Sequence, residues 1–254
     1  MAFYGLPKEK VPALYEHLAA IQKLYNDSNV QGFFGDNLIA LSRNLSFTGD
    51  ETFMDAVRAN QSGDDDGEKL WRLHVCCWAA RGALSLRGDF VECGVYQGLS
   101  AGVVAQYLSF AGQNRTFYLY DTFAGLAEGR STSRERDEVN PFYEWKGTHR
   151  AVLEKFAPFE NVHVIKGVVP DVFAERSPER IAFLHLDMNA AMAETAALDV
   201  LFERIAAGGF ILLDDYGRFE QRALCEAHYH WWQQHNQQIL ELPTGQGLII
   251  KSPG

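Results

Sequence analysis

The hydrophobic pattern of the chain changes near residue 88. Before that point, apolar residues recur at helix spacing, most clearly in VPALYEHLAAIQKLY (11–25) and in GDDDGEKLWRLHVCCWAARGALSL (63–86). Acidic residues at the start of the second stretch are suited to cap the helix that follows. Because no strand is evident in this part, residues 1–87 are predicted to form an N-terminal helical extension.

After residue 87, short apolar runs of β type alternate with helical stretches. The runs are DFVECG (89–94), TFYLYD (116–121), NVHVIKG (161–167), IAFLHLD (181–187) and GGFILLDD (208–215). Helices are predicted near 98–111, 146–157, 170–176 and 192–206. Strands that alternate with helices in this way indicate a parallel sheet covered by helices on both faces.

The end of the chain has a different pattern. QQILELP (237–243) and GLIIKS (247–252) are two strand-like runs separated by turn residues, which predicts a closing antiparallel hairpin. The expected fold class is therefore α/β, with a doubly wound, mostly parallel Rossmann-like sheet of about seven strands. Residues 88–254 would form this domain, with a polar segment near 122–149 as a lid.

Composition and charge narrow the possible ligands. The chain has 254 residues, is 47% hydrophobic and carries a formal charge of -10. Nucleic-acid binding relies on clustered Lys and Arg, so an acidic chain favours small molecules over polyanions. No apolar run approaches the ~20 residues that span a bilayer, and no secretory signal is evident. We expect a cytoplasmic protein that binds neither nucleic acid nor membrane, with four buried thiols and no disulfide.

The turn after the first strand of this sheet is the first candidate binding site. Ligands of such sheets bind outside the carboxyl ends of the strands, and ECGVYQG (92–98) falls there, followed by an acid at the end of the next strand. This geometry suits a dinucleotide or S-adenosylmethionine. The G-x-G-x-x-G pyrophosphate turn is absent and an acidic residue tolerates a sulfonium better than a diphosphate, which favours S-adenosylmethionine. The predicted cofactor-binding residues are Glu92, Gly94, Gly98, Ser100 and Asp121.

Three further acids follow two other strands. Asp187 ends one strand, and Asp214 and Asp215 end the next, 27 residues later, which allows one helix and a return to the adjacent strand. Each acid by itself suits the ordinary role of capping a turn or helix. Three carboxylates at one edge repel one another unless protons or a cation compensate, and oxygen ligands suit Mg²⁺ or another hard divalent ion. A divalent metal site is therefore the preferred interpretation, with capping as the alternative.

Four motifs that include these candidate residues occur in a characteristic order and spacing: GDFVECGVYQGLSA, LYDTFAGL, FLHLDMN and GGFILLDDYG. The chain resembles, over roughly residues 70–251, the macrocin O-methyltransferase (TylF) family of class I S-adenosylmethionine-dependent methyltransferases, which includes enzymes acting on antibiotic deoxysugars. The resemblance implies that Asp187, Asp214 and Asp215 hold the metal and that Asp187 is also the base for the acceptor hydroxyl. It places Glu92, Gly94 and Asp121 on the cofactor-binding positions.

The sequence departs from this family after the strand-end acid. Sugar-modifying members commonly continue with a second acid and a Tyr-Glu pair, whereas this chain has Asn189 and then Ala190, Ala191 and Met192. An amide can still orient a water or a ligand, so the chemistry is retained in this interpretation. The departure bears mainly on which substrate is accepted.

Other polar residues have ordinary structural explanations. His185 lies two residues before the strand-end acid and is expected to be a core or supporting histidine rather than a base. The helix near 222–235, with three histidines and two tryptophans, has no metal-binding spacing and is expected to pack. The lid contains Arg130, Arg134 and Arg136, which either grip an anionic substrate or are solvated loop residues.

These observations predict a metal-dependent O-methyltransferase that acts on a hydroxyl of a small molecule, possibly as a homodimer whose interface the N-terminal helices build. Three alternatives remain at this point. A nicotinamide-dependent oxidoreductase has the same fold, a non-catalytic cofactor-binding protein fits the Ala-Ala-Met departure, and a metal-dependent hydrolase needs the acids but not the glycine turn. Binding of S-adenosylmethionine or NAD, and turnover of an acceptor, distinguish them.

Overall fold

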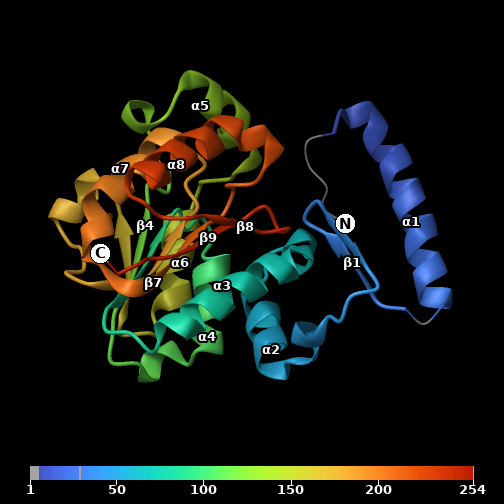
Figure 1. Cartoon of the computed structure of the whole chain (residues 1–254), viewed down its shortest axis with the longest axis horizontal. Helices are drawn as coiled ribbons and strands as arrows, with labels where there is room; N and C mark the ends of the chain where they lie inside the picture. Colours follow the sequence, from blue (N-terminus) through green and yellow to red (C-terminus); the bar gives the residue numbers. More distant parts are fainter. Residues whose placement is uncertain (1–5, 29, 254) are drawn as a thin grey trace.

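The computed structural model describes residues 6–28 and 30–253. Its N-terminal part contains three helices and a β-hairpin, which corrects the expectation that this part has no strand. The elements are α1 (Val11–Asp27), β1 (Gly32–Gly35), β2 (Leu38–Leu41), α2 (Glu51–Asn60) and α3 (Leu70–Ala83). In Figure 1, α1 stands apart from the sheet, and the hairpin lies between α1 and α3.

The hairpin has short strands and a tight two-residue turn. β1 and β2 pair antiparallel over four residues each, and Asp36 and Asn37 at the turn have φ angles of 49° and 59°. Positive φ at both central residues is the hairpin-compatible turn that Asp and Asn tolerate best among non-glycine residues. Strands of four residues show almost no alternation of apolar and polar positions, which explains why they were not predicted from the sequence pattern.

The main sheet has seven strands in the order β5-β4-β3-β6-β7-β9-β8. Its strands are β3 (Asp89–Cys93), β4 (Phe117–Asp121), β5 (Val162–Lys166), β6 (Ile181–Leu186), β7 (Ile205–Leu213), β8 (Leu240–Glu241) and β9 (Gly247–Ile250). β3 to β7 pair in parallel, and β9 pairs antiparallel with both β7 and β8. The predicted parallel sheet and closing hairpin are confirmed.

Helices cover both faces of this sheet. α2, α3 and α4 (Leu99–Tyr107) pack on one face, and α7 (Ala191–Leu201) and α8 (Arg222–Gln234) pack together on the other. Successive strand residues alternate between these two cores: Phe90 belongs to the first and Val91 to the second. α6 (Thr148–Phe156) packs against the edge strand β5. The helices thus leave the strand ends open to build a site.

Some predicted boundaries were wrong. The helix expected near 192–206 ends at Leu201, because β7 already begins at Ile205, and the helix expected near 170–176 is a short 3-10 turn, Asp171–Ala174. The lid segment contains a helix, α5 (Ser133–Val139), whose Thr132 and Glu135 form a capping box. All four cysteines are free, as expected, but only Cys76, Cys77 and Cys93 are buried, whereas Cys225 is partly exposed. Among the described residues, no helix is long and apolar enough to cross a membrane.

The division of the chain at residue 87 stays a prediction. In the structure, α3 of the first segment packs directly against β7 and β6 of the second. At this contact, the buried side chain of Arg72 in α3 reaches the carboxyl end of β7.

Candidate functional site

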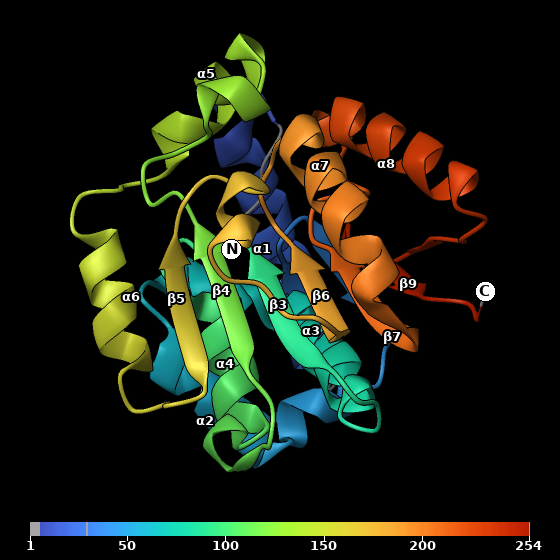
Figure 2. The same cartoon turned by 90° about the vertical axis from the view of Figure 1, so that its left-hand side faces the viewer.

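The carboxyl ends of the parallel strands meet at one edge of the sheet. In Figure 2 the arrowheads of β3, β4 and β5 point toward the side of the molecule where α5 lies. A cavity of about 1320 Å³ opens at this edge. Single small-molecule sites typically measure ~300–1,000 Å³, so the cavity has room for two ligands held side by side.

The turn after β3 approaches the neighbouring strand end closely. Gly94 has a φ of +92°, and a Cβ there would lie 1.9 Å from the backbone oxygen of Asp187. Only glycine fits this position. Gly98, with a φ of +71°, begins α4, and a Cβ there would lie 2.8 Å from the Phe156 ring, so this glycine serves helix packing. Ser100 lines the cavity.

Asp121 lies at the end of β4 and is tied to backbone amides. Its Oδ2 accepts hydrogen bonds from the N–H groups of Val95 and Tyr96, at 2.7 and 2.8 Å, and its Oδ1 accepts one from Phe123 at 2.6 Å. A carboxylate has about four acceptor positions, so one remains. In this structure Asp121 therefore fixes the turn after β3 against β4, in addition to lining the cavity.

A buried chain of three polar side chains crosses β3, β6 and β7. His185 is fully buried, with Nδ1 3.2 Å from Glu92 Oε2 and Nε2 3.3 Å from Asp214 Oδ1. Burial alone would lower the pKa of His185, but its hydrogen bonds to Asp214 and Glu92 raise it well above the ordinary value. Burial raises the pKa of Glu92. The expected core position of His185 is confirmed by its burial, while its supporting role stays a prediction.

The structure brings the three predicted acids together and adds two arginines that the sequence analysis missed. Arg72 of α3 donates through Nη1 to the Asp214 carboxylate and lies 3.5 Å from Asp215 Oδ1. Arg218 donates through Nε to Asp215 Oδ1 at 2.8 Å. Although burial disfavours its charge, Asp214 has a lowered pKa because of Arg72. Much of the repulsion expected among the acids is therefore compensated by the protein itself.

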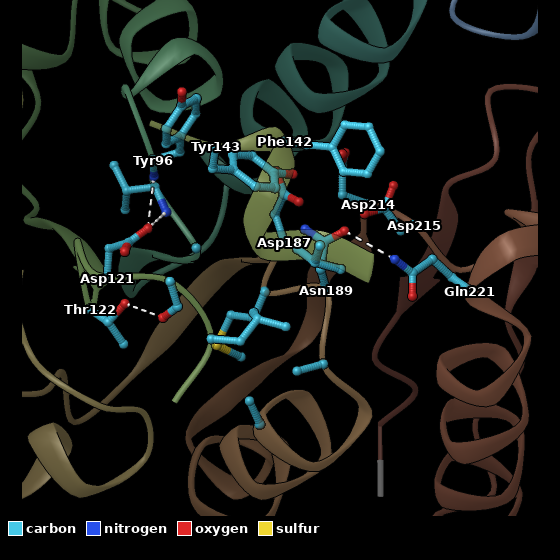
Figure 3. Close-up of a pocket in the computed structure, with 18 of the residues that line it drawn as sticks. Tyr96, Asp121, Thr122, Phe142, Tyr143, Asp187, Asn189, Asp214, Asp215 and Gln221 are labelled. Carbon is cyan, nitrogen blue, oxygen red and sulfur yellow. Dashed lines mark hydrogen bonds between the residues drawn. The ribbon is translucent and has the colours of Figure 1, made fainter. Parts of the chain in front are cut away.

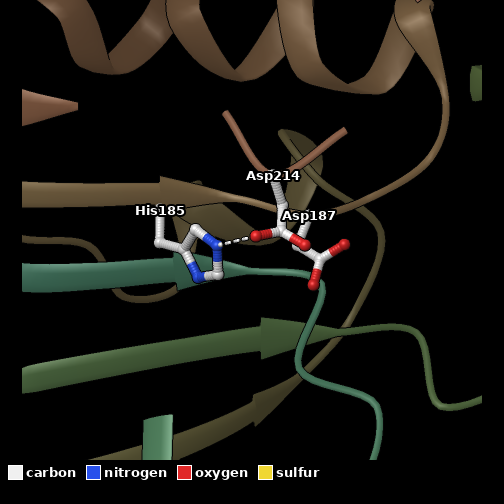
Figure 4. A group of neighbouring side chains, drawn as sticks. All are labelled: His185, Asp187 and Asp214. Carbon is white, nitrogen blue, oxygen red and sulfur yellow. Dashed lines mark hydrogen bonds and ion pairs between the residues drawn. The ribbon is translucent and has the colours of Figure 1, made fainter. Parts of the chain in front are cut away.

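Asp187 is the exception among these acids. Its carboxylate faces the cavity and has no hydrogen-bond partner among the residues that the structure describes. Burial, and then the charges of Asp214 and Asp215, raise its pKa well above the ordinary value. One ligand atom from each of His185, Asp187 and Asp214 lies within 4.8 Å of the others. Figure 4 shows these three side chains together. An open carboxylate at such a position is poised to take a cation or a proton.

Aromatic side chains form the wall between the β3 turn and the lid. Tyr96 has a φ of 47°, and its ring lies edge-on to Tyr143 and Trp145, with centroids 4.8 and 5.4 Å away. The indole Nε1 of Trp145 is buried without a hydrogen-bond partner among the described residues. In Figure 3, Asp121 and the Asp214–Asp215 pair lie on opposite sides of the cavity, with Tyr143 and Asp187 between them. The β3 turn and the acids thus face one space.

The lid is tied down by its own polar side chains. Glu135 of α5 accepts a hydrogen bond from the backbone N–H of Ala191, the first residue of α7, at 3.1 Å. Arg130 pairs with Asp171, and Arg134 pairs with Glu138. These arginines already have carboxylate partners, which weakens the interpretation that they grip an anionic substrate.

The segment after Asp187 is also supported from behind. Asn189 has a φ of 54° and accepts a hydrogen bond from Gln221 at 3.3 Å. Buried Glu194 accepts one from the N–H of Met188 at 3.0 Å and lies 2.7 Å from His228 Nε2. The packing role expected for the α8 histidines and tryptophans is confirmed for His228, which is fully buried, and for the two buried tryptophans beside it.

Comparison with known proteins adds an independent result. A family model described as macrocin-O-methyltransferase (TylF) matches residues 67–243. A curated protein of Streptomyces olivaceus, 8-demethyl-8-(2,3-dimethoxy-alpha-L-rhamnosyl)-tetracenomycin-C 4'-O-methyltransferase, is 30% identical over 138 residues. The match covers 51% of this chain and 53% of that protein, so it spans about half the length of the relative.

Solved structures show the same fold. The O-methyltransferase NovP superposes with a TM-score of 0.62 at 16% identity, covering 72% of this chain and 81% of NovP. The calicheamicin methyltransferase CalS11 superposes with a TM-score of 0.56 at 16% identity, covering 82% and 93%. A Podospora anserina methyltransferase, solved with SAH bound, gives a TM-score of 0.50 at 12% identity over both whole chains. The Rossmann-like arrangement expected from the sequence is confirmed.

Proposed function

Because the chain belongs to the macrocin O-methyltransferase (TylF) family, we propose that it transfers the methyl group of S-adenosylmethionine to a hydroxyl oxygen of a small molecule. The acceptor proposed is a sugar hydroxyl of a secondary metabolite, since the name of the curated relative describes 4'-O-methylation of a rhamnosyl compound. The observation that carries the proposal is the unpaired Asp187 carboxylate, which shares one cavity with the Gly94 turn.

The donor site of the proposal is the β3 turn. Gly94 lets the backbone turn closely, and Glu92, Ser100 and Asp121 line the cavity. Acidic residues beside this turn suit a sulfonium, which is a cation. Asp121 has one acceptor position left for a ribose hydroxyl, because three backbone N–H groups use the others. Gly98 supports this site through the position of α4.

The donor set at the strand ends fits a divalent cation. Asp187 offers both of its oxygens, and Asp214 and Asp215 lie beside it with their arginine partners. Asp36 adds a fourth carboxylate beside the two guanidiniums. Mg²⁺ prefers oxygen ligands in this arrangement. When bound, such an ion lowers the pKa of a hydroxyl in contact with it and orients it.

The residues of the chain have distinct tasks in the proposed transfer. The carbon–sulfur bond of the donor breaks as the acceptor oxygen bonds to the methyl carbon, and the hydroxyl proton passes to Asp187. Tyr96, Tyr143 and Trp145 wall the cavity, so that water is kept from the reacting groups. The raised pKa of Asp187 suits a group that must take up a proton.

A panel of glycosylated acceptors tests the proposal directly. Purified protein with S-adenosylmethionine and Mg²⁺ should yield a methyl ether and S-adenosylhomocysteine, and excess chelator should stop the transfer until Mg²⁺ or Mn²⁺ is restored. If methyl transfer continues undiminished in chelator, the proposed O-methylation is supported and the proposed metal dependence is wrong. A thermal shift with NAD but not with S-adenosylmethionine would instead favour an oxidoreductase.

A non-catalytic cofactor-binding role is the second candidate. It is favoured by Ala190, Ala191 and Met192, which replace polar residues of sugar-modifying members, and Met192 is exposed. Binding of S-adenosylmethionine without turnover of any acceptor would support it. We also propose that the protein acts in the cytoplasm and forms a homodimer. Light scattering of the purified protein tests the dimer.

A further inference from the structure

The turn of the N-terminal hairpin reaches the strand-end acids. Asp36, at the turn between β1 and β2, is 6% exposed. Its Oδ2 accepts a hydrogen bond from Nε of Arg72 at 2.7 Å, and its Oδ1 accepts one from Nη2 of Arg218 at 2.9 Å. One carboxylate from the N-terminal segment therefore binds both arginines of the site.

The same two arginines contact the acids after β7. Arg72 donates from Nη1 to Asp214, while its Nε faces Asp36. Arg218 donates from Nε to Asp215, while its Nη2 faces Asp36. Each guanidinium is thus shared between Asp36 on one side and a strand-end acid on the other. Its orientation depends on both partners, because the planar fork of donors is rigid.

The charge of Asp36 decides how much negative charge the site retains. Asp36 adds one negative charge beside Arg72 and Arg218, which otherwise lie against the strand-end acids Asp214 and Asp215. This charge offsets part of the positive charge that the two guanidiniums bring to the site. Partners that orient metal ligands typically change metal affinity 10–100-fold when they are altered.

We propose that Asp36 is a positioning residue of the divalent-cation site: it holds Arg72 and Arg218 so that Asp214 and Asp215 keep charge and oxygen atoms available to the cation. This inference rests on the metal dependence in the proposed function. Asp36 lies outside residues 67–243, the segment that matches the family model. The hairpin therefore completes a site whose acids lie in another part of the chain.

An Asp36→Asn variant separates charge from shape. Asp36 has a positive φ, and Asn tolerates this conformation as well as Asp does, so the turn should be kept. Binding of Mn²⁺ by the whole chain, followed by electron paramagnetic resonance of the free ion, is the readout and needs no acceptor. The expected result is affinity about 10–100-fold weaker than wild type. Asp55→Asn, which removes an exposed carboxylate paired with Arg58, is the charge-matched control and should bind as wild type does.

A second variant tests whether charge is the cause. Asp36→Asn combined with Arg218→Gln removes one charge of each sign and should regain most of the lost affinity, whereas a purely structural role of Asp36 predicts no recovery. Arg218→Gln alone should bind Mn²⁺ at least as tightly as wild type, and weaker binding there overturns the proposal even if Asp36→Asn does not fold.

The remaining outcomes are also decisive. Affinity of a folded Asp36→Asn variant within about twofold of wild type, below the range typical of such partners, overturns the role of Asp36 and leaves the proposed function intact. Wild-type protein that binds neither Mn²⁺ nor Mg²⁺ overturns the metal dependence itself and this inference with it.

Discussion

Arg72 holds Asp214 at two points with a single guanidinium nitrogen. Nη1 donates to the Asp214 carboxylate and, at 2.6 Å, to the backbone oxygen of the same residue. The two residues are 142 positions apart. Helix α3 is thereby anchored to the end of β7, where the acids of the site begin.

Replacing Arg72 by Gln should strongly destabilise the protein. Removal of one partner of a buried ion pair leaves uncompensated charge and typically costs about 3–5 kcal/mol. Arg72 lowers the pKa of Asp214 against the opposing effect of burial, so its contribution is fully present above the unfolded Asp pKa of about 3.9 and is lost as the pH falls further. Urea unfolding at pH 7 and near pH 3 measures both effects. Arg87→Gln, at an exposed position, is the control and should change little.

Replacing Asp187 by Asn should separate activity from folding. Loss of a general base typically reduces rate ~10²–10⁴-fold, while cofactor binding should be retained. Burial and the neighbouring acids raise the pKa of Asp187, so ionised Asp187 costs stability that is absent at low pH and grows as the pH rises toward the raised pKa.

The same variant should therefore be more stable than wild type at pH 7 without metal. A gain of roughly 1 kcal/mol corresponds to a Tm about 2–4 °C higher for a chain of this size. Melting curves check the stability and calorimetry with S-adenosylhomocysteine checks binding. Unchanged methyl transfer would exclude Asp187 as the base.

Replacing Asp121 by Ala should weaken cofactor binding by about 1–3 kcal/mol, the range for hydrogen bonds to charged groups. The structure adds a reason, because the variant also frees the amides of Val95 and Tyr96 that hold the β3 turn. Isothermal calorimetry measures the change. Equal affinities would mean that Asp121 serves neither the cofactor nor the shape of its turn.

Replacing Glu135 by Ala should loosen the lid. The change removes both the capping box of α5 and the hydrogen bond to Ala191. Limited proteolysis should cut within 122–149 faster in the variant, and S-adenosylmethionine should slow cleavage in both proteins. Glu138→Ala removes only the exposed pair with Arg134 and serves as the matched control. Equal resistance of this segment in all three proteins would contradict the role of Glu135 in holding it.

The sequence predicted the parts of the fold that have local patterns. The apolar runs before Cys93, Asp121 and Leu186 are buried strands, and the rule that parallel strands end at one edge correctly brought Asp187 and Asp214 together. Helix α5 also has a local signal in the sequence, the Thr132-x-x-Glu135 capping box.

The compensating charges had no local signal. Arg72 contacts Asp214 across 142 positions, and Asp36 contacts Arg218 across 182. Such pairs follow from how helix and hairpin pack on the sheet, which residue spacing does not encode. For this reason the acids looked uncompensated in the sequence, although the folded chain supplies two cations beside them.

Tyr96 belongs to the turn after β3 and also contacts the segment predicted to be a lid, since its ring contacts Tyr143 and Trp145 and its hydroxyl accepts a hydrogen bond from the N–H of Glu144 at 3.3 Å. If the predicted lid opens by parting these rings, the spent donor and the methylated product of the proposed reaction share one exit. The opening rate of the lid then sets an upper limit on how often the cycle can repeat, whatever the speed of the chemical step.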